Sequence, residues 1–118
     1  MGENKIEGEQ DYYVRRSYRP ISDNFDEQSK LIREKLKLSD IYGQLAEECC
    51  ELAQIALKAQ RMLEGRNPTD RRIGDVGFAV VEEFTDVMLC ADILHLEIDE
   101  DVYDRKLERW ADRLKKEE

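Results

Sequence analysis

The apolar residues between positions 41 and 63 recur at spacings of three and four, and this feature most restricts how the chain can fold. The series comprises Ile41, Leu45, Cys49, Leu52, Ala56, Ala59 and Leu63. An α-helix of 3.6 residues per turn gathers such residues on one face. The pattern therefore predicts an amphipathic helix over about 40–64, capped by Ser39 or Asp40 and ended by Gly65 as its C′ residue.

An earlier helix is predicted before this one. Asn24, followed three residues later by Glu27, has the spacing of a capping box, which places a helix from residue 25 to about 38. A single long helix over 25–64 is an alternative that the sequence leaves open. Residues 1–23 are polar, with tyrosines interleaved among arginines, and we expect a polar arm that precedes the folded domain of residues 24–118.

Two helices are predicted after the loop that begins at Gly65. The first, over roughly 76–97, has a main stripe on one side and Leu89 and Ile93 on the other; the stripe consists of Val76, Val80, Phe84, Val87, Ala91 and Leu94. A helix that is apolar nearly all round is buried on two sides, so we expect its second side to meet another subunit. Asp99 is expected to cap the last helix, whose apolar positions are Tyr103, Leu107, Trp110 and Leu114.

These patterns predict an all-α fold, a bundle of about four helices in one domain whose core is completed by oligomerisation. The 118 residues include 28 acidic and 19 basic ones, a net charge of −9 that argues against stable nucleic-acid binding. No run of about 20 apolar residues predicts a membrane span, and the first ten residues lack the apolar core of a signal peptide, so we expect a cytoplasmic protein. With one histidine, His95, a metal site built from several histidines is excluded within one chain.

Two acidic pairs with the same spacing lie on the two central helices. Glu48 and Glu51 form one pair, and Glu83 and Asp86 form the other. Successive residues of a helix are about 100° apart around its axis. In each pair the first carboxylate therefore lies near the edge of the apolar stripe, and the second lies further from the stripe on the same flank. Two such helices packed antiparallel would bring four carboxylates together.

Four neighbouring carboxylates repel one another unless a cation lies among them. The nearest basic residues on the same helix, Lys58 and Arg61, are two or more turns away. Oxygen ligands alone suit Mg²⁺, with Mn²⁺ as a substitute. The pattern therefore predicts a Mg²⁺ site, while ordinary solvated helix faces are the alternative in a chain with 40% charged residues.

The segments 47–53 and 82–87, with the motifs EExxE and ExxD, resemble the MazG-like all-α nucleoside triphosphate pyrophosphohydrolases. Residues 98–113 resemble the fourth helix of that family, and the resemblance extends over roughly residues 39–114. It implies a homodimer or homotetramer that hydrolyses a nucleoside triphosphate to the monophosphate and pyrophosphate. The expected role is housekeeping of the nucleotide pool, with non-standard or deoxyribonucleotide substrates included.

The resemblance also implies roles for individual residues. Glu48, Glu51, Glu83 and Asp86 would ligate Mg²⁺, and Glu48 or Glu51 would orient or deprotonate the attacking water. The candidates for phosphate contact are Lys58, Arg61, Lys106 and Arg113. Trp110 stands where many relatives have an asparagine. A non-catalytic dimerisation or regulatory module that retains the family fold is the alternative.

Overall fold

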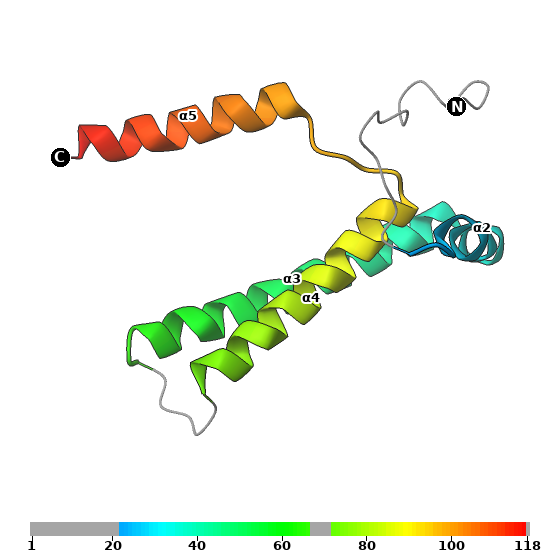
Figure 1. Ribbon diagram of the computed structural model, residues 1–118, viewed down its shortest axis with the longest axis horizontal. Coiled ribbons are helices and arrows are strands. Elements are labelled where there is room, and N and C mark those ends of the chain that lie inside the picture. Colours follow the sequence, from blue (N-terminus) through cyan, green and yellow to red (C-terminus); the bar gives the residue numbers. More distant parts are fainter. Residues whose placement is uncertain (1–21, 67–71, 118) are drawn as a thin grey trace.

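The computed structural model describes residues 22–66 and 72–117, and these residues form four helices and no strand. The helices are α2 (Phe25–Lys35), α3 (Leu38–Leu63), α4 (Ile73–Ile93) and α5 (Glu100–Lys116) (Figure 1). The predicted all-α class is confirmed. The predicted arm lies outside the described residues except for positions 22 and 23. No described helix combines the length and the apolar character needed to cross a membrane.

The central unit of the fold is an antiparallel hairpin of α3 and α4, the one pair of described helices that packs along most of its length (Figure 1). A small apolar core lies where α3 begins and α4 ends, and it contains Ile41, Ile93 and Leu94. Phe25 and Ile32 of α2 pack against this core, so α2 closes one end of the hairpin. Burial of these apolar side chains removes hydrocarbon from water and fixes the register of the two long helices.

Two residues in extended conformation separate α2 from α3, so the alternative of one long helix over 25–64 is wrong. Leu36 and Lys37 have extended backbones, and Lys37 rather than Ser39 or Asp40 is the N-cap of α3. Asp40 acts from the third position of the helix, where its carboxylate accepts the Lys37 backbone N–H at 3.0 Å. The helix before this break ends at residue 35 rather than 38.

The predicted capping box at Asn24 is also wrong in its chemistry. Asn24 occupies the N-cap position of α2, but its side chain makes no capping hydrogen bond. Its backbone N–H donates instead to Ser22 Oγ at 3.1 Å.

The ends of α3 and α4 share one closing geometry. Gly65 has a φ of 72°, and the Arg66 N–H donates to the Arg61 carbonyl at 2.9 Å, which confirms Gly65 as the C′ residue. In α4 the same position is taken by His95, with a φ of 61°. The Leu96 N–H donates to the Ala91 carbonyl at 2.9 Å, so α4 ends at residue 93 rather than 97. A glycine is the usual sequence signal for such a helix end, and α4 has histidine there, so the sequence did not indicate where α4 ends.

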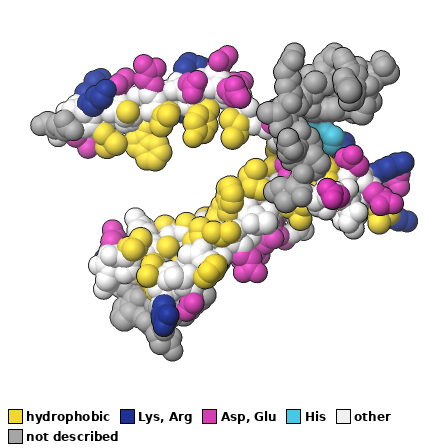
Figure 2. Space-filling view, in the orientation of Figure 1, with side chains coloured by type: hydrophobic (Ala, Val, Ile, Leu, Met, Phe, Trp, Pro, Cys, Tyr) yellow, Lys and Arg dark blue, Asp and Glu magenta, His cyan; other side chains and the backbone are white. Residues whose placement is uncertain are grey.

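The start of α5 was predicted correctly. The Asp99 carboxylate accepts the Val102 N–H at 3.0 Å and caps the helix. The predicted apolar positions of α5 share one face, but none of them is buried, because α5 packs extensively against no other described helix. Figure 2 shows these side chains across an open gap from apolar side chains of the hairpin.

Only one side of α4 is covered within the described chain, and the contact of its second side with another subunit stays a prediction. Val76 is completely buried and Ile93 nearly so, but Phe84 of the predicted main stripe is more than half exposed. Phe78 is 79% exposed, and Leu89 on the far side is also open to solvent. One side of α4 therefore packs on α3, and the other has no covering element among the described residues.

Replacing Ile41 by alanine should lower the free energy of unfolding by about 2–4 kcal/mol, because the side chain is buried in the core at the closed end of the hairpin. Urea denaturation followed by circular dichroism measures the change. The control Leu31→Ala removes a half-exposed side chain of α2 and should cost less than about 1 kcal/mol. Equal losses in the two variants would contradict the assignment of this core.

Candidate metal centre

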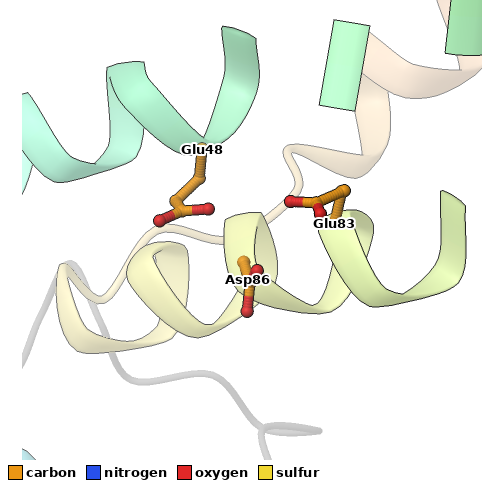
Figure 3. A group of neighbouring side chains, drawn as sticks. All are labelled: Glu48, Glu83 and Asp86. Carbon is orange, nitrogen blue, oxygen red and sulfur yellow. The ribbon is translucent and has the colours of Figure 1, made fainter. Parts of the chain in front are cut away.

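Three carboxylates converge across the interface of α3 and α4. Glu48 comes from α3, and Glu83 and Asp86 come from α4, where a spacing of three places them on one side of the helix. One oxygen of each carboxylate lies within 4.8 Å of the others. Figure 3 shows Glu48 and Glu83 reaching toward each other from the two helices, with Asp86 one turn further along α4. The antiparallel packing thus joins acidic residues that are 35 or more positions apart in sequence.

Two of the oxygens in this cluster are both shielded and unpaired. Oε1 of Glu48 and Oε1 of Glu83 are inaccessible to solvent and accept no hydrogen bond. The other oxygen of Glu48, Oε2, accepts a hydrogen bond from Gln44 Nε2 at 2.7 Å. Burying charged oxygens without partners is unfavourable, because they lose hydration that nothing in the protein replaces. The unpaired oxygens are the observation that a bound cation would explain.

No basic side chain of the described residues neutralises the cluster. The ion pairs among those residues join Lys30 to Glu34 and Arg66 to Glu64, and both lie on exposed surface away from it. Arg66 donates from Nε to Glu64 Oε1 at 2.7 Å, so it is engaged locally. The negative charge of the cluster is therefore left to solvent ions or to a bound cation.

Glu51 borders the cluster, although it is not one of the three converging carboxylates. It is exposed on α3, one turn beyond Glu48. The negative charge of Glu48, followed by partial loss of hydration and by the charge of Glu83, raises the pKa of Glu51 above its ordinary value. Of the four carboxylates predicted to come together, three converge and Glu51 lies beside them.

Two neighbours of the cluster were not predicted. Cys90 lies one turn after Asp86 on α4 and is buried, and burial, then the charges of Glu48 and Asp86, raise the pKa of its thiol. The signal that could have revealed Cys90 in the sequence was its spacing of four from Asp86. Gln44, four residues before Glu48 on α3, had the same kind of signal.

The four basic candidates lie at different places in the fold. Lys58 and Arg61 are half-buried on α3; Lys58 is seven residues, or about 10 Å, beyond Glu51 on the same side of the helix. Lys106 and Arg113 are exposed on α5, and neither pairs with the cluster among the described residues. The structure therefore brings Lys58 nearest to the carboxylates along one helix face and leaves the two α5 residues apart from them.

The donor set of the cluster fits a hard divalent cation. Its three carboxylates offer oxygen atoms only, which suit Mg²⁺, Mn²⁺ or Ca²⁺ better than metals that prefer nitrogen or sulfur. Such an ion would give the unpaired oxygens of Glu48 and Glu83 a positively charged partner. The residues present thus fit the metal that the sequence predicted.

Replacing Glu51 by glutamine should raise the melting temperature of the metal-free protein near pH 7. The pKa of Glu51 is raised in the folded state, so its favourable neutral form is lost as the pH rises through that value. The gain should shrink toward zero at about pH 4, where the carboxyl group is largely protonated in both folded and unfolded chains. Thermal unfolding of both proteins in EDTA across this range measures the effect.

The matched control for this measurement is Glu47→Gln, which removes an exposed glutamate of the same helix outside the cluster. A stabilisation by Glu47→Gln equal to that of Glu51→Gln would show a general charge effect and contradict the local one.

No family model, no curated protein and no solved structure matches this chain.

Proposed function

We propose that this chain hydrolyses a nucleoside triphosphate to the nucleoside monophosphate and pyrophosphate with the help of Mg²⁺. The observation that supports a metal-dependent reaction is the convergence of Glu48, Glu83 and Asp86, with two shielded oxygens unpaired. The nature of the reaction rests on the resemblance of the two acidic segments to the MazG-like family. The setting we propose is nucleotide-pool housekeeping in the cytoplasm, with non-standard and deoxyribonucleoside triphosphates among the substrates.

In this proposal Glu48, Glu83 and Asp86 hold the ion, and Glu51 completes the ligand set from the exposed side. Bound Mg²⁺, or Mn²⁺ in its place, would supply neutralisation of the triphosphate charge and a lowered pKa for a coordinated water. Gln44 holds Glu48 by its hydrogen bond and so fixes the direction of that carboxylate. Glu48 and Glu51 are the candidates to orient or deprotonate the attacking water.

The phosphate groups would be contacted by basic residues. Lys58 and Arg61 follow the carboxylates along α3 and are the candidates on that helix. Lys106 and Arg113 are the candidates on α5. The working unit in this proposal is a homodimer or homotetramer.

A second candidate function is a non-catalytic helical module for dimerisation or regulation. The observation that favours it is the large exposed apolar surface of α4 and α5, which serves assembly whether or not the protein is an enzyme. The two functions differ in their response to metal, because only the first requires an ion among the carboxylates.

The proposed reaction predicts pyrophosphate release from a panel of ribo- and deoxyribonucleoside triphosphates in Mg²⁺ and none in EDTA. The measurement is a coupled pyrophosphate assay, with the monophosphate product identified by chromatography. Release of inorganic phosphate instead would assign a different bond cleavage. A folded protein that turns over none of the panel would favour the non-catalytic module.

Glu51→Gln should lower the rate about 100-fold to 10,000-fold if Glu51 activates water. Asp86→Asn should raise the Mg²⁺ concentration needed for half-maximal rate at least about 10-fold, because it weakens a ligand. Glu82→Gln, which changes an exposed neighbour on α4 outside the cluster, is the control and should leave both quantities near those of the unmodified chain. Normal kinetics in Glu51→Gln and Asp86→Asn would show that the site is misassigned.

A further inference from the structure

The apolar stripe of α5 is narrow and unburied. It comprises Tyr103, Leu107, Trp110 and Leu114, which are 54–62% exposed. At about 100° per residue these four side chains fall within an arc of about 60° on the helix, the width of a single seam. Figure 2 shows the stripe turned toward the hairpin, with an open gap between the two apolar surfaces.

The exposed apolar face of α4 is much broader than this seam. It comprises Ile73, Phe78, Val81, Phe84, Met88 and Leu89, each at least 40% exposed. These positions span about 160° of the helix at about 100° per residue. One helix with a stripe as narrow as that of α5 cannot cover such an arc, so closure of α5 onto its own hairpin would leave much of the face in water.

The exposed area is of the size that a stable dimer buries. Taking about 200 Å² for each large side chain, the ten residues of these two faces expose on the order of 1,000 Å². A stable interface buries about 800 Å² on each partner, whereas the largest apolar patch of a typical monomer is about 300–600 Å². The two faces are therefore too large for an ordinary monomer and large enough for self-association.

We propose that the α3–α4 hairpin of a second copy of this chain fills the gap, so that the α5 helix of each copy packs on the hairpin of the other. The hairpin of the second copy then contacts α5 of the first copy on one side and the hairpin of the first copy on the other. Two contacts of this kind together can cover the broad apolar arc of α4, which α5 alone cannot. A two-fold axis makes the exchange reciprocal, because both copies offer the same two faces. The inference rests on the homo-oligomer within the proposed function and adds the exchange of α5.

The exchange is tested by nuclear magnetic resonance on a mixture of two forms of the full chain. One form is uniformly ¹³C-labelled, its Trp110 ring included, and the other is unlabelled; the two are mixed in the unfolded state and refolded together. Trp110 is the only tryptophan, so filtered Overhauser contacts from its unlabelled ring to labelled methyl groups arise between copies. We expect such contacts to methyl groups of Val81, Met88 or Leu89, and a dimer or a larger even assembly by sedimentation.

Two results would overturn the exchange. One is a monomer in which the Trp110 ring contacts hairpin methyl groups in a uniformly labelled sample, while the filtered contacts between copies are missing from the mixed sample. The other is a dimer in which the filtered contacts to the hairpin are missing although the intrachain contacts are present. Neither readout uses hydrolysis, so the two proposals fail separately. An exchanged dimer that releases no pyrophosphate would contradict the proposed function and support this inference. An active chain whose α5 packs on its own hairpin would support the proposed function and contradict this inference.

A pair of matched variants provides an independent measurement. Trp110→Glu places a charge in the seam and should weaken the dimer at least about 30-fold, the loss typical of an interface hot spot. Arg105→Glu changes a residue about 170° away from the seam on the same helix and should leave the dimer constant unchanged. Circular dichroism establishes that both variants keep their helices, and equal dimer constants for the two would contradict the proposal.

Discussion

The antiparallel contact between α3 and α4 is the interaction on which the rest of this structure depends. It buries Val76 and Cys90, it anchors α2 through the core around Ile41, and it sets the register at which the two acidic segments meet. A shift of one residue along either helix would rotate a carboxylate by about 100° and separate the group. Apolar packing therefore holds together side chains that would otherwise repel one another.

The convergence of these carboxylates is electrostatically unfavourable. Glu48 and Glu83 each keep an oxygen away from solvent without a partner, and their charges raise the pKa of Glu51. Such a site lowers the stability of the chain unless something positive occupies it. Structural roles alone would be served better by uncharged residues at these positions, and this contrast is what makes a functional interpretation of the cluster attractive.

Apolar surface is distributed unevenly over the described residues. The closed end of the hairpin has a core, whereas the outer face of α4 and the whole stripe of α5 have none among the described residues. Helical stability in proteins comes mostly from packing of an apolar face, so α5 in particular depends on a surface to pack against. Exchange of α5 between copies would couple assembly to the stability of that helix.

The sequence by itself determined the helices, because apolar spacing, Gly65 and the Asp99 cap are local signals that act within a few residues. It also placed the acidic pairs of the two central helices on the flanks of their apolar stripes. It failed at the end of α4, where His95 takes a backbone conformation usually given to glycine, and at the break after residue 35. Tertiary structure decided that Glu48, Glu83 and Asp86 converge while Glu51 stays outside, and that Cys90 and Gln44 adjoin them. Those outcomes depend on the register and rotation of two packed helices, which are set by side chains distant in sequence and carry no local signal.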